Sequence, residues 1–254
     1  EEYVEYIKPF IPLISNIIIN YKNKISLNYQ KDLFLSHMSH EIRTPLNGII
    51  GMGQFLIDTK LNEEQKKMIH IINKCSLQLL SFVNDLLDFS HITDGKLNFD
   101  MKEFDLEECL KSALELFQLE IDDKQLSIFI DYDRKIPIKI IHDRQRIQQI
   151  IVNIISNAIK FTNTGGHVNI KSILKNNHVE ISISDNGIGM NEEKHKFLFE
   201  IISNTTTLGT ANENGSGLGL VLCKEFVNKN GGTIWAESEE GKGSCFKFTL
   251  PLNP

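Results

Sequence analysis

Two long stretches of the chain carry apolar residues at alternating steps of three and four, with Pro45 at the one missing position of the first stretch. Residues 58–64, which are polar except for Leu61, separate the two stretches. This heptad spacing predicts two long helices joined as an antiparallel hairpin. The stripes are too apolar to face water, so we expect two copies to pair into a four-helix bundle; the alternative is packing against the chain's own C-terminal part. The apolar positions are Leu35, Met38, Ile42, Ile49, Met52 and Leu56, then Met68, Ile72, Cys75, Leu79, Phe82, Leu86 and Phe89.

The pattern changes after Asp94 and Gly95, whose turn chemistry ends the second helix. Stretches with apolar residues at period two then alternate with helical stretches. This mixture predicts an α+β sandwich with helices on one face of a mixed sheet. We predict strands over 97–104, 126–132, 168–174 and 179–184, helices over 106–124, 144–161, 192–200 and 218–230, and two closing strands around the glycines at 231–232 and 241–243.

Length and charge narrow the possible functions. A chain of 254 residues is expected to hold about two domains. We divide it into a connector from an upstream sensor domain (1–27), a dimerisation hairpin (28–95) and an α+β domain (96–254). The net charge of −6 argues against a nucleic-acid partner and against membrane contact by this segment.

Cysteine usage indicates a cytoplasmic location. The four cysteines are scattered and form no C-x-x-C pair, which fits reduced thiols rather than disulfides or a zinc site. No apolar run approaches the ~18–20 residues that span a bilayer, although a longer parent protein could still be membrane-anchored.

The first candidate motif is Ser-His-Glu-Ile-Arg-Thr-Pro-Leu at residues 39–46. His40 falls at heptad position f, far from the helix seam, where its imidazole can reach a large phosphate donor. Glu41 can accept a hydrogen bond from its Nδ1–H, which leaves the Nε2 lone pair for attack. An exposed histidine on a helix is usually only a solvated surface residue, so this assignment depends on the rest of the chain.

The second motif lies in the predicted helix 144–161. Asn153 and Asn157 are four residues apart and share a helix face, and Lys160 lies close to the same stripe. Amide oxygens are suitable ligands for Mg²⁺, and a lysine ammonium group suits phosphate. The alternative for this segment alone is a solvated helix face.

The third motif follows the predicted strand 179–184. Alternation places Asp185 on the strand's apolar face, where a buried carboxylate needs a partner. The 6-amino group of adenine can be that partner, and Gly187 and Gly189 would let the backbone pass close to a flat base. The alternative is a simple glycine-containing turn.

The fourth motif is Gly-Ser-Gly-Leu-Gly at residues 215–219, directly before an apolar helix. Gly215, Gly217, Leu218 and Gly219 would expose backbone N–H groups at a helix N-terminus, which suits phosphates. A dinucleotide fingerprint does not fit, because no strand–turn–helix unit leads into the run. The Thr-, Asn- and Gly-rich residues 203–214 are expected to form a mobile lid.

These four motifs, in this order, resemble those of the sensor histidine kinase family, and the resemblance extends over residues 31–252. It implies a phosphoacceptor box at 39–46, an asparagine box at 153–161 and two glycine boxes at 185–189 and 215–219. It also implies a Bergerat-type fold for the ATP-binding domain and the style of hybrid kinases, in which a receiver domain follows further along the chain.

The resemblance also implies roles for single residues. His40 would be phosphorylated, Glu41 would polarise it, and Thr44 would help to dephosphorylate a partner. Asn153 and Asn157 would hold Mg²⁺ and the phosphates of ATP. Lys160 would bind a phosphate and Asp185 the adenine. A homodimer and a response-regulator receiver domain are the implied partners.

Two departures from the family's pattern concern catalytic rate. The Phe-x-Pro-Phe run expected after the first glycine box is reduced to Phe199, and no basic residue lies between Ile201 and Gly219. A missing lid cation removes one source of charge stabilisation for phosphoryl transfer. One alternative is therefore a catalytically weak, nucleotide-binding dimeric scaffold. Another is an ATPase of the chaperone or topoisomerase kind, but Asn153 stands where such enzymes carry a helix acid.

Overall fold

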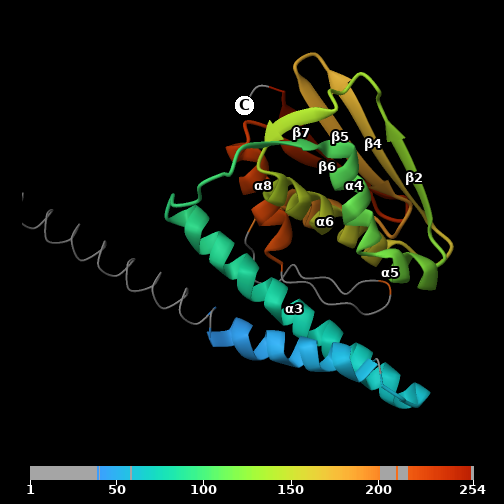
Figure 1. Ribbon diagram of the computed structural model, residues 1–254. Helices are drawn as coiled ribbons and strands as arrows, with labels where there is room; N and C mark the ends of the chain where they lie inside the picture. Colours follow the sequence, from blue (N-terminus) through green and yellow to red (C-terminus); the bar gives the residue numbers. More distant parts are fainter. Residues whose placement is uncertain (1–38, 40, 58, 201–209, 211–216, 253–254) are drawn as a thin grey trace, which may run out of the picture. The chain divides into compact units, whose positions relative to one another are not determined.

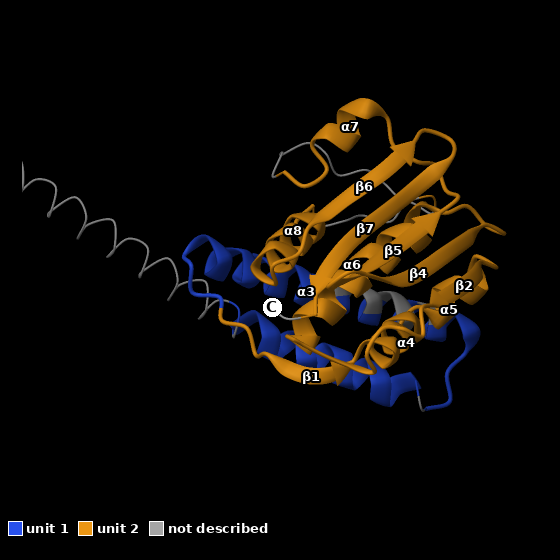
Figure 2. Ribbon diagram, turned by 90° about the horizontal axis from the view of Figure 1, so that it is seen from above, with its two compact units in different colours: residues 1–97 blue, residues 98–254 orange. Residues whose placement is uncertain are grey.

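The computed structural model describes residues 39, 41–57, 59–200, 210 and 217–252. The chain forms two compact units, Glu1–Leu97 and Asn98–Pro254 (Figure 2). The described part of the first unit is helical, and the second unit mixes helices and strands. Within the part of the chain that the structure describes, no helix is both long enough and apolar enough to cross a bilayer.

The first unit contains a helical hairpin (Figure 1). One helix covers residues 41–57, and the other, α3, spans Glu63–Thr93. A capping box begins α3: the Asn62 side chain accepts from the Gln65 N–H at 2.8 Å, and the Gln65 side chain accepts from the Asn62 N–H at 3.0 Å. Just past α3, Gly95 takes a positive φ of 68°, which ends the helix at the predicted turn.

Two contacts show that the hairpin helices run antiparallel. Arg43 Nη2 donates to Asn84 Oδ1 at 3.0 Å. Further along, Gly53 lies so close to Asn73 that an added Cβ would overlap with the asparagine side chain. The later residue of the first helix, Gly53, thus contacts the earlier residue of α3, Asn73, as antiparallel helices require. The hairpin predicted from the heptad spacing is confirmed.

The seam inside the hairpin differs from the predicted apolar stripe of α3. The buried residues of α3 are Ile69, Ser76, Val83, Asp85 and Ser90, and three of these five are polar. Four residues of the predicted stripe stay exposed in the single chain, Met68 54%, Ile72 50%, Leu79 47% and Phe82 42%, whereas Leu86 and Phe89 are half-buried. The hairpin therefore closes on its less apolar positions and leaves its apolar stripe for another surface.

The second unit is built on a five-stranded mixed sheet with the strand order β2-β4-β5-β7-β6. The β2–β4 pair is parallel and the other neighbours are antiparallel. A separate two-stranded antiparallel sheet joins β1 and β3. The strands are β1 (Lys102–Asp105), β2 (Ser127–Tyr132), β3 (Lys139–His142), β4 (His167–Lys175), β5 (His178–Asp185), β6 (Ile234–Glu239) and β7 (Gly243–Pro251).

Helices cover one face of the five-stranded sheet (Figure 1). Along β5, every second residue from Val179 to Asp185 is buried, and this face packs against α6. An isoleucine stripe from Ile147 to Ile159 fills the space between α6 and its neighbours. The predicted α+β sandwich with helices on one face is confirmed. The helices are α4 (Leu106–Glu115), α5 (Gln118–Asp123), α6 (Arg144–Phe161), α7 (Glu192–Lys196) and α8 (Gly219–Lys229).

Several predicted elements have different bounds in the structure. The helix predicted over 106–124 breaks into α4 and α5 around Phe117, because the turn redirects the chain so that Ile121 is buried. Of the strand predicted over 97–104, only residues 102–104 are paired, in β1, which continues to Asp105. The helix predicted over 192–200 ends at Lys196, since none of its residues is buried to support a longer helix. Strand β3 was not predicted.

Candidate active site

Helix α6 carries the asparagine motif, and its start is fixed by Asp143. One oxygen of this carboxylate accepts from the Arg146 N–H at 3.1 Å, which caps the helix. The other accepts from the Asp100 N–H at 3.0 Å, which ties the segment before β1 to the same point. The isoleucine stripe faces inward, and Asn153, Asn157 and Lys160 lie half-buried beside it.

Asn153 meets the second glycine run in space. Its Nδ2 lies 3.4 Å from the Gly219 carbonyl oxygen and 3.8 Å from Cys223 Sγ, both on α8. A Cβ at Gly219 would lie 3.4 Å from the asparagine side chain, about an ordinary van der Waals contact, so Asn153 packs directly on the start of α8. Because its nitrogen faces α8, Asn153 keeps Oδ1 as an acceptor for a further partner.

The other two polar residues of α6 lie one and two turns further along. Asn157 is half-buried, and within the described residues its side chain makes no hydrogen bond. The Lys160 ammonium group lies 4.9 Å from the centre of the Phe161 ring. The stripe therefore presents amide groups and one cation, a donor set that fits Mg²⁺ and phosphate oxygens.

Asp185 ends β5 with its side chain buried, at 9% exposure. Its Oδ1 accepts from the Gly187 N–H at 2.9 Å and from the Ser244 N–H at 3.3 Å. Burial raises the pKa of this carboxyl above its ordinary value, and the two N–H groups oppose that rise. Among the described residues none donates to Oδ2, so this oxygen is open to a hydrogen-bond donor from a ligand.

Gly187 and Gly189 allow protein backbone segments to approach each other. A Cβ at Gly187 would overlap with the Phe161 carbonyl at the end of α6. Gly189 has a φ of 63°, and a Cβ there would overlap with the Glu239 carbonyl at the end of β6. The Ile188 N–H donates to the Phe161 carbonyl at 3.1 Å, so the first glycine run is bound to α6. The predicted approach to a flat base stays a prediction.

The second glycine run is described only from Gly217 onward; Gly215 lies outside the described residues. Gly217 has a φ of 72°, a backbone conformation that favours glycine, and α8 begins two residues later. Leu218 is the N-cap residue of α8 and makes no side-chain cap hydrogen bond. Of the expected lid, 203–214, only Thr210 is described.

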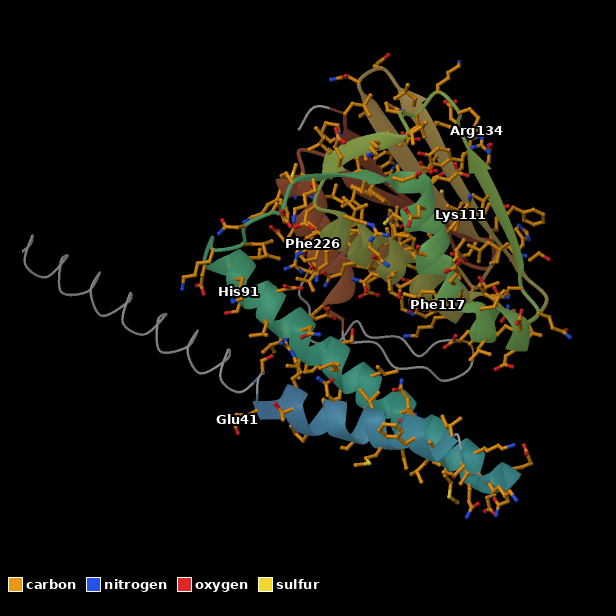
Figure 3. The ribbon with its side chains drawn as sticks, viewed as in Figure 1. Glu41, His91, Lys111, Phe117, Arg134 and Phe226 are labelled. Carbon is orange, nitrogen blue, oxygen red and sulfur yellow. The ribbon has the colours of Figure 1, made fainter. Side chains whose placement is uncertain are left out.

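The predicted phosphoacceptor, His40, also lies outside the described residues. Its neighbour Glu41 is exposed at the start of helix 41–57 (Figure 3), and Thr44, one turn further along, is exposed as well. The helix continues through Pro45. The sequence neighbours of His40 that would assist phosphoryl transfer are thus on the surface of the first unit.

Two groups that shape the site could not be predicted from the sequence. The Ser244 backbone N–H donates to Asp185, 59 residues away in the sequence. Cys223 Sγ lies next to the Asn153 amide, 70 residues away. A backbone donor has no side-chain signature, and a buried cysteine in an apolar helix looks like any small core residue. The sequence held no signal for either.

Comparison with known proteins identifies the two units. Residues 30–95 match the family described as "His Kinase A (phospho-acceptor) domain", and residues 142–254 match "Histidine kinase-, DNA gyrase B-, and HSP90-like ATPase". The chain belongs to the histidine kinase family. It carries the family's catalytic core, with the helical and ATPase parts in the order predicted from the motifs.

Individual histidine kinases support the same assignment. The chain is 38% identical over 231 residues to the signal transduction histidine-protein kinase BarA of Escherichia coli (strain K12), covering 88% of this chain and 25% of BarA. Full-length ShkA in complex with AMPPNP superposes with a TM-score of 0.67 and 31% identity, covering 85% of this chain and 45% of ShkA. The histidine kinase ThkA in complex with the response regulator TrrA superposes with a TM-score of 0.58 and 26% identity, covering 86% of this chain and 61% of ThkA. The chain thus spans about a quarter of BarA.

Proposed function

We propose that this histidine kinase core binds ATP in its second unit, phosphorylates its own His40, and passes the phosphoryl group to an aspartate of a response-regulator receiver domain. The observation that carries the proposal is the meeting of three predicted motifs at α6. Asn153 packs on Gly219 at the start of α8, and Ile188 of the first glycine run donates to the last residue of α6. Motifs that are distant in the sequence therefore come together around α6.

Each motif has a distinct task in binding. Oδ2 of Asp185 accepts a hydrogen bond from the 6-amino group of adenine, with Gly187 and Gly189 shaping the loop that follows. Lys160 binds a phosphate, and N–H groups of Gly215, Gly217, Leu218 and Gly219 bind phosphates at the start of α8. Asn153 and Asn157 would hold Mg²⁺, which would supply positive charge to neutralise the phosphates. Among the described residues, nothing donates to Oδ1 of Asn153 and the Asn157 amide makes no hydrogen bond, which supports this assignment.

At His40 the Nε2 lone pair attacks the γ-phosphorus. The new N–P bond forms as the bond to the bridging oxygen breaks, and ADP leaves. Glu41 accepts a hydrogen bond from Nδ1–H and stabilises the positive charge that the ring acquires. The receiver aspartate then takes the phosphoryl group from His40, and Thr44 helps to remove phosphate from that partner.

A labelling experiment tests the proposal. The purified chain is incubated with γ-labelled ATP and Mg²⁺, and the bound label is tested in acid and in base. Phosphohistidine is expected, which is lost in acid and retained in base. A label that survives acid, as a phosphate ester does, would contradict transfer to an imidazole.

The proposal extends to domain roles and to a receiver partner. Residues 1–27 would connect an upstream sensor, 28–95 would dimerise and carry His40, and 96–254 would bind ATP. The receiver domain follows in a longer hybrid chain or is supplied by a separate protein. The ThkA structure, named as a complex with a response regulator, supports a receiver partner.

The exposed stripe of α3 supports a homodimer built on the hairpin. Met68, Ile72, Leu79 and Phe82 are all more than two-fifths exposed in the single chain. On the first helix, Met52 is 68% exposed on the face that turns away from buried Leu46. Two hairpins that join these stripes would bury them in a four-helix bundle.

Replacing Leu79 and Phe82 together with glutamate is expected to give monomers, because four like charges would then meet in the bundle core. Light scattering of the purified chain measures the change. A matched control places the same charges at Leu77 and Ser81, which are exposed on the opposite face of α3, and should stay dimeric. A wild-type chain that is monomeric at high concentration would contradict the bundle.

The raised pKa of Asp185 predicts a pH effect on ATP binding. The ionised carboxylate is the acceptor for adenine, and burial makes protonation easier than for an ordinary aspartate. Affinity should therefore begin to fall, on acidification, at a higher pH than an exposed aspartate would give. Calorimetry over a mildly acidic to neutral range measures this fall. In the Asp185→Asn variant, ATP affinity should change with pH only through the titration of ATP itself. Identical pH profiles for the variant and wild type would refute the role of Asp185 as the adenine acceptor.

A further inference from the structure

The C-terminal end of α6 has its backbone carbonyl groups satisfied from several parts of the second unit. The last carbonyls of a helix have no partner within the helix. Thr162 satisfies the Ala158 carbonyl with both its hydroxyl, at 2.6 Å, and its N–H, at 3.1 Å. Ile188 satisfies the Phe161 carbonyl at 3.1 Å. The carbonyls of Ile159 and Lys160 remain, and their donors come from further away.

Lys124 supplies the donor for both remaining carbonyls. Its Nζ lies 3.0 Å from the Ile159 carbonyl oxygen and 3.1 Å from that of Lys160. A third contact, at 2.8 Å, reaches Oγ1 of Thr210. The ammonium group thus directs its three N–H bonds to three oxygens, and its charge lies at the end of a helix where a cation is favoured.

Thr210 binds the same end of α6. Its N–H donates to the Lys160 carbonyl at 3.1 Å, and its hydroxyl lies 2.9 Å from that carbonyl and 3.1 Å from the Thr162 carbonyl. The hydroxyl has one proton to give to these carbonyls and accepts the N–H of Lys124 with a lone pair. Lys124 and Thr210, 86 residues apart, therefore share one carbonyl and bind each other.

We propose that Lys124 and Thr210 form a positioning pair for the nucleotide site. The pair holds the last turn of α6, and so places the Lys160 side chain for a phosphate. The inference rests on the proposed nucleotide binding by α6. The pair acts through the backbone of Lys160 and does not itself touch ATP. It also brings a cation to Thr210, and the sequence between Ile201 and Gly219 contains no basic residue of its own.

A double-mutant cycle tests the pair. Lys124→Met keeps the side-chain stem and removes the charge, and Thr210→Val removes the hydroxyl at constant shape. Each variant is expected to bind ATP about tenfold more weakly, because the last turn of α6 and the Lys160 side chain are then less firmly held for a phosphate. The loss in the double variant should be smaller than the sum of the two single losses, because Lys124 and Thr210 contact each other and share the Lys160 carbonyl. Calorimetry gives the affinities, and a thermal melt of each variant shows whether it is folded.

Two further variants separate positioning from general stability. Thr210→Ser keeps the hydroxyl and should retain near wild-type affinity. Lys135→Met removes an exposed lysine in the loop after β2 and should change nothing. Losses that add in the double variant, or a lowered melting temperature with unchanged ATP affinity, would overturn the positioning role. If Lys124→Met does not fold, the two Thr210 variants still test the proposal. Weaker ATP binding by Thr210→Val together with near wild-type binding by Thr210→Ser supports it, and unchanged binding by Thr210→Val refutes it.

Hydrogen exchange without nucleotide keeps this inference distinct from the proposed function. The Thr210 N–H should exchange faster in Lys124→Met than in wild type, because the shared carbonyl is less firmly held. If wild type does not bind ATP, the proposed function fails, and faster exchange still supports the pair while unchanged exchange refutes it.

Discussion

Replacing His40 with glutamine is expected to abolish autophosphorylation while leaving ATP affinity near the wild-type value. Glutamine has a similar size and polarity, but its amide nitrogen has no lone pair available for attack on phosphorus. The proposed adenine and phosphate contacts all lie in the second unit, from Asn153 to Gly219, and none uses residues of the 39–46 motif. Catalysis and binding should therefore separate cleanly in this variant.

The measurement combines labelling with γ-labelled ATP and calorimetry on the same preparation. His91→Gln is the matched control, because His91 is also a histidine of the hairpin and lies in the last turn of α3 (Figure 3). This control should be labelled like wild type. Label that persists on His40→Gln would place the phosphoacceptor elsewhere, and a parallel loss of ATP affinity would mean that the two units cannot be separated in function.

The sequence predicted best those elements whose local pattern and tertiary packing agree. Helix α6 has the predicted bounds, because the Asp143 cap and the isoleucine stripe both specify it. Strands β4 and β5 extend only one residue beyond each predicted end, since strict alternation over that length allows one buried face. The sequence pattern merged α5 with α4 and did not reveal strand β3. Both are short segments that gain stability mainly from contacts distant in the sequence.

The hairpin shows a different limit of pattern reading. Apolar spacing identified the stripe of α3 that includes Leu79 and Phe82, yet polar Ser76 is among the buried residues of α3 that face the first helix. Small residues let two helices approach closely, so the intramolecular seam is the less apolar one. A helix that packs against two neighbours needs two contact stripes, one for each neighbour. Apolar spacing alone identifies only the more hydrophobic of the two.

At the candidate site, the sequence identified side chains with chemical character but not the groups that hold them. Asn153 and Asp185 stand out because polar residues interrupt apolar patterns. Lys124 does not, because a lysine beside a turn is typical of any surface. Its role depends on carbonyl groups 35 and 36 residues away, and only the folded chain brings them together.

Replacing Asp185 with asparagine is expected to weaken ATP binding by about tenfold to a hundredfold without disturbing the loop. The asparagine Oδ1 can still accept from the Gly187 and Ser244 N–H groups, so the local fold should be kept. Nδ2 then replaces Oδ2, and a donor faces the adenine amino group in place of an acceptor. A hydrogen bond to a charged group contributes about 1.5–3 kcal/mol, which corresponds to that loss of affinity.

A nucleotide without the 6-amino group gives the matched control for Asp185→Asn. Inosine triphosphate offers a carbonyl oxygen at that position, which repels the wild-type carboxylate and accepts from the asparagine. Wild type should therefore prefer ATP, and the variant should lose that preference or reverse it. Calorimetry with both nucleotides on both proteins measures the change in preference independently of any general loss in affinity. Equal weakening for the two nucleotides would mean that Asp185 supports the loop through Oδ1 alone and does not read the base.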